Sequence, residues 1–344
     1  MKNILLLTTG GTIACTEGAN GYTPTLSGEA LLEYVPQVRE YARLRVQPLL
    51  NKDSTNMEPR DWLSIADAIF DHWLKYDGIV VLHGTDTMAY SASAVSFMTL
   101  GIGIPVVFTG SQHPVGQPES DAPRNLADAI CTACRCDLGG VLLTFDGTVF
   151  NGCCVSKVST SELHAFESCG GTPVGRIRHG ALQITAPPRR DVRTSLTWRR
   201  SLDSRVLFLK ITPGMDGALL ELATLGHYPI VVLEGFGLGG IPSGENGLLE
   251  RITQLHRRGI LVVVTTQCSR GRCDMTVYEA GQAALEHGAL CSSVISKEAL
   301  LTKLMWILAQ TQAPEEIEQL LFHDFCGELG TNFPPIDKDG ARVI

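Results

Sequence analysis

Two short apolar runs, each followed directly by a turn that contains glycine and threonine, constrain the fold of this chain more than any other feature. Residues 4–7 (Ile-Leu-Leu-Leu) precede Thr-Gly-Gly-Thr-Ile-Ala at 9–14, and residues 79–82 (Ile-Val-Val-Leu) precede His-Gly-Thr-Asp-Thr at 83–87. Such runs, bounded by glycine and turn residues, are typical of buried strands in a parallel sheet. Because ligands of open α/β sheets bind beyond the carboxyl ends of the strands, both turns are predicted to face one site.

The rest of the chain continues this alternation of strand-like and helix-like segments. Strands are predicted at 46–50, 104–108, 141–143, 206–211, 230–233 and 260–264, and helices at 60–76, 89–100, 125–130 and about 298–308. Strands that alternate with helices predict βαβ units and a doubly wound, mainly parallel sheet. A basic stretch around 186–204 interrupts the pattern and is interpreted as a solvated surface linker rather than a nucleic-acid site.

The length of 344 residues favours two domains. We predict an N-terminal α/β domain at 1–185 that carries most of the site, a linker at 186–204 and a C-terminal α/β domain at 205–344. The formal net charge of −8 argues against a nucleic acid or an anionic membrane as partner. No apolar stretch reaches the ~20 residues of a membrane helix, and the N-terminus lacks a signal-peptide pattern. We therefore expect a cytoplasmic protein.

Eleven cysteines and one glycine cluster invite other interpretations. Several cysteines lie in apolar segments, which is typical of reduced core thiols in the cytosol. Cys131, Cys134 and Cys136 lack the second pair that a structural zinc site needs, so buried helix cysteines are expected instead. Residues 235–240 match G-x-G-x-x-G, but the acidic residue of a dinucleotide site is missing at the end of the next strand. A tight turn is the preferred explanation.

The first threonine turn contains a candidate nucleophile, Thr12. Gly10 and Gly11 would let the backbone approach a substrate and leave N–H groups free to hold an oxyanion. The alternative is that Thr12 only caps a helix. A loop at 15–24 follows, and Tyr22 on it could close over Thr12 as a lid. The ordinary pKa of tyrosine, about 10, means that Tyr22 needs a nearby cation to act as a base.

The second turn provides Thr85 beside Asp86, and a third polar segment, Asp-Ser-Thr-Asn-Met, occupies 53–57. Thr85 and Asp86 can share one hydrogen-bond network, although an adjacent Thr-Asp pair is usually only a turn or cap. The segment at 53–57 lies between a predicted strand and a predicted helix, where it could simply cap that helix.

Taken together, these motifs resemble the asparaginase/glutaminase family of bacterial-type L-asparaginases. The resemblance rests on residues 9–14 and 53–57, on Leu-His-Gly-Thr-Asp-Thr-Met-Ala-Tyr at 82–90 and on Thr-Gly-Ser-Gln at 109–112, and it covers essentially the whole chain. The chain is most similar to the cytoplasmic, type I branch. The family fold would be a larger N-terminal doubly wound domain and a smaller C-terminal α/β domain. Subunits would pair as a homodimer or homotetramer.

The resemblance also implies an activity: hydrolysis of L-asparagine through an acyl-enzyme on Thr12, with no metal or cofactor. Whether Thr12 or Thr85 attacks first stays open. The implied catalytic residues are Thr12, Tyr22, Thr85, Asp86 and Lys157, and the implied substrate contacts are Gly11, Asp53, Ser54, Thr55, Thr85, Asp86 and Ser111. Asp86 would hold the substrate ammonium group, because a carboxylate suits a cation. Lys157 is placed by the short match Val-Ser-Lys at 155–157.

Two features depart from the family pattern. Some members supply Asn and Glu side chains to a neighbouring subunit's site, and residues 236–240 do not obviously provide them. Some type I members have an effector site near the turns of the C-terminal domain, and Thr-Gln-Cys at 266–268 matches one such turn. However, Glu234 occupies the place where an arginine would be expected to bind a carboxylate. We therefore do not expect asparagine to act as an effector.

Four other functions are compatible with parts of the sequence. The chain could be a glutamine-preferring amidohydrolase, or an amidotransferase component, although the latter usually carries an extra N-terminal domain and this chain starts at its first strand. A non-catalytic amino-acid sensor is disfavoured because Thr12, Thr85, Asp86 and Lys157 are all present. A dinucleotide-binding protein that uses residues 235–240 would be stabilised by NAD, which we do not expect.

Overall fold

The computed structural model describes residues 1–18, 21–185 and 199–330, and for residues 16–18 and 21–24 only the backbone is described. The chain forms two compact units. Among the described residues, the first contains 1–18, 21–168, 172–185, 199–200 and 325–327, and the second contains 169–171, 201–324 and 328–330. Most of the predicted linker at 186–204 lies outside the described residues, so the proposed domain boundaries remain a prediction.

The first unit is built on an eight-stranded mixed sheet. Its strands, in spatial order, are β12 (Ala181–Ile184), β11 (Gly175–Arg178), β8 (Thr148–Asn151), β7 (Gly140–Phe145), β6 (Pro105–Thr109), β5 (Gly78–Leu82), β1 (Lys2–Gly10) and β4 (Ala42–Lys52). The five strands from β4 to β7 are parallel. The predicted strands at 4–7, 46–50, 79–82, 104–108 and 141–143 are confirmed, as is the mainly parallel sheet.

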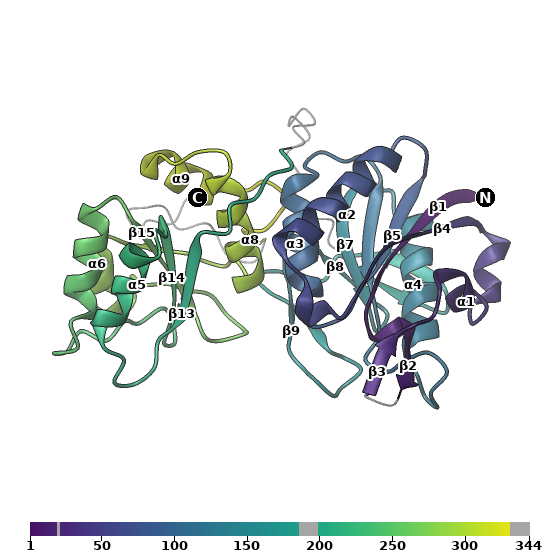
Figure 1. Cartoon of the computed structure of the whole chain (residues 1–344), viewed down its shortest axis with the longest axis horizontal. Coiled ribbons are helices and arrows are strands. Elements are labelled where there is room, and N and C mark those ends of the chain that lie inside the picture. Colours follow the sequence, from purple (N-terminus) through teal and green to yellow (C-terminus); the bar gives the residue numbers. More distant parts are fainter. Residues whose placement is uncertain (19–20, 186–198, 331–344) are drawn as a thin grey trace. The chain divides into compact units, whose positions relative to one another are not determined.

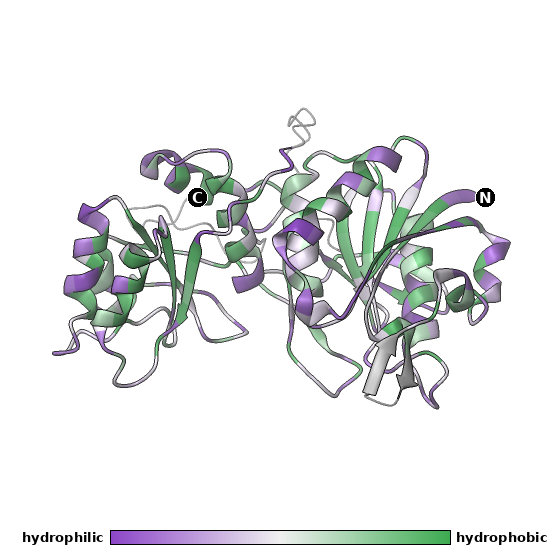
Figure 2. Ribbon diagram, in the orientation of Figure 1, coloured by the Kyte–Doolittle hydropathy of each residue, from purple (hydrophilic) through white to green (hydrophobic). Residues whose placement is uncertain are grey.

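Helices cover both faces of this sheet. In Figure 1, α2 (Pro59–His72) and α3 (Met88–Met98) lie on one side of the strands, and α1 (Gly28–Leu32) and α4 (Ala122–Arg135) lie on the other. Ile4 and Leu6 of β1 pack in one core cluster with Leu126 and Ile130 of α4. Figure 2 shows the strands of this sheet as mainly hydrophobic, with hydrophilic residues on the helices around them. The predicted helices at 60–76, 89–100 and 125–130 are thus confirmed.

Short elements complete the first unit. They are η1 (Thr12–Ala14), β2 (Cys15–Gly18), β3 (Gly21–Pro24), η2 (Pro36–Glu40), η3 (Ser54–Asn56), β9 (Val155–Lys157) and β10 (Phe166–Ser168). Strands β2 and β3 pair as an antiparallel hairpin, so the segment predicted as a loop is largely strand. Strands β9 and β10 form a separate two-stranded sheet.

The second unit contains a four-stranded parallel sheet. Its strands are β13 (Val206–Lys210), β14 (Ile230–Gly235), β15 (Leu261–Thr266) and β16 (Ala289–Cys291), in that order. Its helices are η4 (Gly217–Leu220), α5 (Glu221–Leu225), α6 (Leu248–Arg257), α7 (Glu279–Glu286), α8 (Lys297–Leu308) and α9 (Pro314–Leu321). The predicted second α/β pattern, including the helix at about 298–308, is confirmed.

The cysteines of α4 and the lengths of the helices bear on two predictions, that there is no zinc site and no membrane helix. Cys131 and Cys134 lie on α4, and Cys131 is buried, as expected for helix cysteines. Within the described ranges, no three His, Cys, Asp or Glu residues are grouped so that they could hold a metal ion. None of the helices described there is both long enough and apolar enough to cross a membrane.

The parallel strands follow the spatial order β4-β1-β5-β6-β7, so the chain leaves β1 toward one sheet edge and later returns to its other side at β5. The gap between the ends of β1 and β5 is therefore a topological switch point, where ligands of such sheets bind. Backbone fills this gap: a Cβ on Gly11 would lie 2.3 Å from the Gly84 nitrogen. Gly11 also has φ +84°, a conformation that favours glycine.

We predict that Gly11→Ala lowers the free energy of unfolding by at least ~2 kcal/mol, because the methyl group would collide with backbone and the left-handed φ would be strained. The matched control is Gly103→Ala, since a Cβ there meets no atom within 4 Å. That exposed substitution should change stability by less than ~0.5 kcal/mol. Urea unfolding of the three proteins checks both values, and equal stabilities would contradict the proposed close approach.

Candidate active site

The first threonine turn is held by a backbone bond to β4. The Gly11 N–H donates to the Lys52 carbonyl at 3.1 Å. The expectation that this N–H is free to hold an oxyanion is therefore wrong, because the β1–β4 pairing continues past the end of the predicted strand and engages it. Thr12 follows as the first residue of η1 and is half-buried. Gly11 thus fixes the backbone of the turn through this hydrogen bond, and with it the position of Thr12.

The second turn holds a cation against a buried threonine. Lys157 Nζ donates to Thr85 Oγ1 at 2.8 Å and to Asp86 Oδ1 at 2.7 Å. Thr85 is only 4% exposed, whereas the Asp86 side chain is 57% exposed and the Lys157 side chain 15%. A cation in a mostly dry position stabilises negative charge on a neighbouring oxygen. The arrangement can therefore assist proton transfer at Thr85, and Asp86 keeps Lys157 in place.

Gln112 is a further member of this group that the sequence analysis did not select. Thr85 Oγ1 donates to Gln112 Oε1 at 3.2 Å, while Gln112 Nε2 donates to the Ser159 and Glu162 carbonyls at 3.4 and 3.2 Å. Since only the amide nitrogen can donate to carbonyls, the orientation of the side chain follows from its partners. Gln112 thus accepts a hydrogen bond from the Thr85 hydroxyl, while Lys157 donates one to a lone pair of the same oxygen.

Ser111, which was selected instead, is fully buried, and its hydroxyl donates to the His113 carbonyl at 2.7 Å. The hydroxyl therefore serves the local turn. The signal for Gln112 was its place at the end of the motif at 109–112, three residues past a buried strand.

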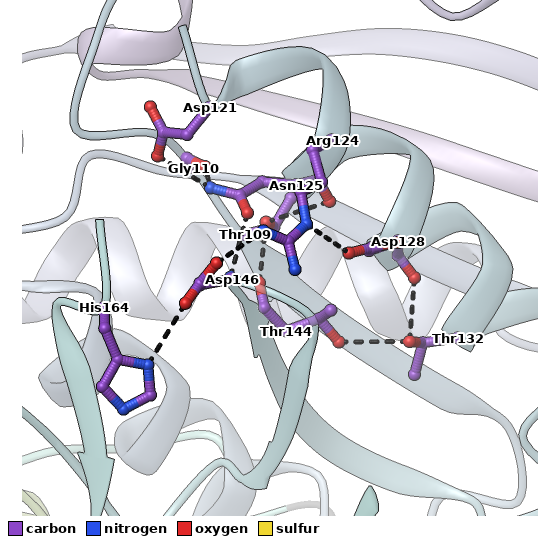
Figure 3. Close-up of polar contacts among 10 residues, drawn as sticks. All are labelled: Thr109, Gly110, Asp121, Arg124, Asn125, Asp128, Thr132, Thr144, Asp146 and His164. Carbon is purple, nitrogen blue, oxygen red and sulfur yellow. Dashed lines mark hydrogen bonds and ion pairs between the residues drawn. The ribbon is translucent and has the colours of Figure 1, made fainter. Parts of the chain in front are cut away.

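A polar network behind β6 holds the turn that carries Gln112, and Figure 3 draws its members Gly110, Asp121 and Asn125. Asp121 accepts the Gln112 N–H at 2.9 Å and the Asn125 amide at 2.9 Å, and Asn125 also donates to the Gly110 carbonyl at 3.0 Å. Asn125 Oδ1 accepts the N–H of Asp146 at 3.0 Å. Because each buried polar group finds a partner, the network fixes a single turn geometry.

The outer side of this network is charged. Asp146 accepts from Arg124 at 2.7 Å and lies 3.3 Å from His164 Nδ1, and Arg124 reaches Asp128 at 3.8 Å. Burial raises the pKa of Asp128 to about 6. His164 lies in the same loop as the Ser159 and Glu162 carbonyls, so both ends of that loop are tied to the network around Gln112.

The segment at 53–55 lies beside the second turn. The buried Ser54 is packed against Gly84, where an added Cβ would lie 2.5 Å from Ser54 Oγ, and Thr87 Oγ1 donates to the Ser54 carbonyl at 2.8 Å. Asp53 Oδ1 accepts the N–H of Thr55 at 2.8 Å, so Asp53 caps η3 as well as being a candidate ligand. Asp53 and Thr55 are exposed.

A buried histidine anchors the second turn. His83 Nδ1 lies 2.7 Å from the Gly84 carbonyl, so Nδ1 must carry the proton. Nε2 then accepts from Ser91 Oγ at 2.8 Å, and Ser91 accepts the Trp62 indole N–H at 2.8 Å. Burial lowers the pKa of His83 to about 4, against smaller opposing effects of the Gly84 carbonyl and Asp61. The neutral ring therefore fixes the Gly84 peptide that precedes Thr85.

The structure thus brings together Gly11, Ser54, Thr85, Asp86 and Lys157, with Gln112 added. Thr12 is adjacent to Gly11 in the chain. The backbone of Tyr22 belongs to β3, but its side chain lies outside what is described, so its role as a lid remains a prediction.

In the second unit, residues 235–240 form a tight turn closed by a bridge between Phe236 and Gly240. The next helix, α6, begins only at Leu248, so the helix N-terminus that a dinucleotide fingerprint requires is not placed there. The preferred explanation of a tight turn is confirmed. Glu234 is buried and lies 3.6 Å from Lys297.

Comparison with known proteins gives a consistent result. Residues 3–190 match the family model "Asparaginase, N-terminal", and residues 205–321 match "Glutaminase/Asparaginase C-terminal domain". The chain is 40% identical to an L-asparaginase of Thermococcus kodakarensis over 95% of this chain and 98% of that protein. It is 31% identical to one component of the glutamyl-tRNA(Gln) amidotransferase of Pyrococcus horikoshii, over 96% of this chain and 77% of that component.

Solved structures agree with these matches. The thermostable L-asparaginase from Thermococcus kodakarensis superposes with a TM-score of 0.88 at 39% identity, covering 95% of this chain and 99% of that one. L-asparaginase I from Vibrio cholerae superposes with a TM-score of 0.85 at 29% identity, with the same coverage.

His83 predicts a pH dependence of stability. Its folded pKa of about 4 lies below its ordinary value of 6.5, so between these values the unfolded chain binds the proton more strongly. Stability from this group is complete above pH 6.5 and is lost as the pH falls toward 4, by up to ~1.4 kcal/mol per pH unit. Asp128 has a raised pKa, so its contribution to stability increases as the pH falls. Because this contribution is the same in wild type and variant, it cancels when their pH curves are compared.

The check is urea unfolding of wild type and His83→Gln between pH 7 and 4.5. The variant is expected to be less stable at pH 7 and to lose less stability on acidification. Parallel pH curves would contradict the role assigned to His83.

Proposed function

The chain belongs to the asparaginase/glutaminase family, and from that premise we propose that it hydrolyses L-asparagine to L-aspartate and ammonia. The observation that carries the proposal is the contact of the Lys157 ammonium group with both the Thr85 hydroxyl and the Asp86 carboxylate. A charge pair built around a buried hydroxyl at a sheet switch point suits acyl transfer. The name of the Thermococcus kodakarensis relative at 40% identity supports the choice of substrate.

In the proposed reaction, the Thr12 hydroxyl attacks the side-chain amide carbon of the substrate. The proton of the Thr12 hydroxyl passes to the amide nitrogen, ammonia leaves, and an acyl-enzyme remains on Thr12; water then releases aspartate and restores the hydroxyl. Thr85 relays a proton, because Lys157 and Gln112 hold its oxygen and hydrogen in defined directions. Tyr22 closes over Thr12. The reaction requires neither a metal ion nor a cofactor.

The same proposal assigns the substrate contacts. Asp86 binds the α-ammonium group, since half of its side chain stays exposed beside Lys157. The segment at 53–55 binds the α-carboxylate and α-ammonium groups, and its position against Gly84 supports this assignment. The Ser111 backbone carbonyl meets the side-chain amide, and Gly11 lines the site through its backbone. We further propose a cytoplasmic homodimer or homotetramer.

Two alternatives remain within reach of experiment. A glutamine-preferring amidohydrolase would use the same residues on a longer side chain. A role in an amidotransferase is suggested by the Pyrococcus horikoshii relative, but its identity of 31% is lower than the 40% of the L-asparaginase. Ammonia release from asparagine, glutamine and D-asparagine by the purified protein alone separates these functions.

We predict that Thr12→Ala lowers kcat for asparagine by ~10³-fold or more, because the acyl-enzyme cannot form. Thr12→Ser should retain measurable activity, since it keeps a hydroxyl. The measurement is ammonia release, with circular dichroism to verify folding. Acid quenching and mass spectrometry should locate the acyl group on Thr12 in wild type; an adduct on Thr85 would assign the attack to that residue instead.

Lys157→Met is expected to reduce kcat by about 10²–10³-fold with a smaller change in KM, because methionine keeps most of the apolar stem of the side chain but removes the cation beside Thr85. The exposed Lys75→Met provides a matched control and should leave kcat unchanged. The measurement is kcat and KM for asparagine in wild type and the two variants. An unchanged kcat in Lys157→Met would remove Lys157 from the mechanism.

A further inference from the structure

Two cysteines outside the proposed mechanism lie in direct contact. Cys153 Sγ and Cys326 Sγ are 3.1 Å apart, although 173 positions separate the residues in the chain. Cys153 lies in the turn between β8 and β9, and Cys326 lies beyond α9. Cys153 is fully buried, whereas Cys326 is partly exposed.

Backbone and side-chain hydrogen bonds hold the two segments around the thiols. Asn151 Nδ2 donates to the Cys326 carbonyl at 2.9 Å, and Asn151 Oδ1 accepts the Cys153 N–H at 3.3 Å. The Cys154 thiol donates to the Gly327 carbonyl at 3.0 Å. A disulfide forms without strain only where the backbone already brings two cysteines together. These bonds meet that condition for Cys153 and Cys326.

We propose that Cys153 and Cys326 are a thiol–disulfide site that reacts with low-molecular-weight disulfides. The thiolate of the partly exposed Cys326 attacks one sulfur of the small disulfide, which yields a mixed disulfide and one equivalent of small thiol. The Cys153 thiolate then attacks the Cys326 sulfur and displaces the second equivalent. Two protein thiols are oxidised and one small disulfide is reduced to two thiols, so electrons and protons balance.

The bond would tie the turn before β9 to the segment at 325–327 and would close a loop of 173 positions. Such a long loop restricts the unfolded chain strongly, so the disulfide is expected to stabilise the first unit. The test of this site does not depend on the proposed asparagine chemistry, because its readouts do not use activity.

Cys154 provides a matched control, because it is the immediate neighbour of Cys153 but its thiol contacts a carbonyl. Purified wild type, Cys153→Ser, Cys326→Ser and Cys154→Ser are incubated with oxidised glutathione, alkylated and digested with trypsin without reduction. A crosslink between the peptides 136–157 and 304–338 is expected in wild type and Cys154→Ser, and it should disappear on adding dithiothreitol. Wild type should lose two more titratable thiols than Cys326→Ser.

The same oxidation is expected to raise the thermal unfolding midpoint of wild type and Cys154→Ser by several degrees, and to leave Cys153→Ser unchanged. Absence of the crosslink in wild type overturns the proposal. A crosslink that survives in Cys153→Ser also overturns it, because Cys136 or Cys154 would then be the partner. Cys326→Ser, at a partly exposed position, repeats the test should Cys153→Ser fold poorly.

Discussion

The contact between the Gly11 and Gly84 backbones is the constraint on which the rest of the site depends. A Cβ on either residue would meet the other turn, since an added Cβ on Gly84 would also lie 3.2 Å from the Gly11 Cα and 2.5 Å from Ser54 Oγ. The connections after β1, β4 and β5 therefore meet at this point. No side chain separates the backbone after β1 from the backbone after β5. This close approach places the residues that follow each glycine, Thr12 and Thr85, at one point of the sheet edge.

Burial then decides which side chains around this backbone contact are neutral and which are charged. His83 is enclosed on all sides and stays neutral, because its pKa falls to about 4, and it uses both ring nitrogens to fix the turn. The Lys157 ammonium group contacts two residues that differ in exposure: the Asp86 carboxylate is exposed to solvent, and the Thr85 hydroxyl is buried. Because the buried His83 ring is neutral, the positive charge that acts on the Thr85 oxygen is the one on Lys157.

Much of this arrangement could be predicted from the sequence because short apolar runs and their turns are local patterns. The parallel strands and the polar residues that follow them were found in this way, and Lys157, chosen on a three-residue match, lies beside Thr85 and Asp86. The N–H of Gly11 was misjudged because its partner, the Lys52 carbonyl, depends on the register between two strands that are distant in sequence. Gln112 was missed for a similar reason: its orientation is set by carbonyls 47 and 50 positions away. The antiparallel strands β8, β11 and β12 are short and contain no long apolar run, so tertiary pairing decides them.

Lys157 depends on anchors outside the main sheet. Strand β9 has three residues and, in the described part of the chain, forms a two-stranded sheet with the equally short β10, and an isolated two-stranded ribbon has little stability of its own. On one side of β9, the turn with Asn151 and Cys154 is bound to the Cys326 and Gly327 carbonyls; on the other side, the Ser159 and Glu162 carbonyls are bound to Gln112. The position of the cation beside Thr85 is therefore set jointly by a segment near the end of the chain and by the network behind β6. Substitutions at Asn151 or Asn125 would act on Thr85 through Lys157 and Gln112, because those two residues are the hydrogen-bond partners of Thr85.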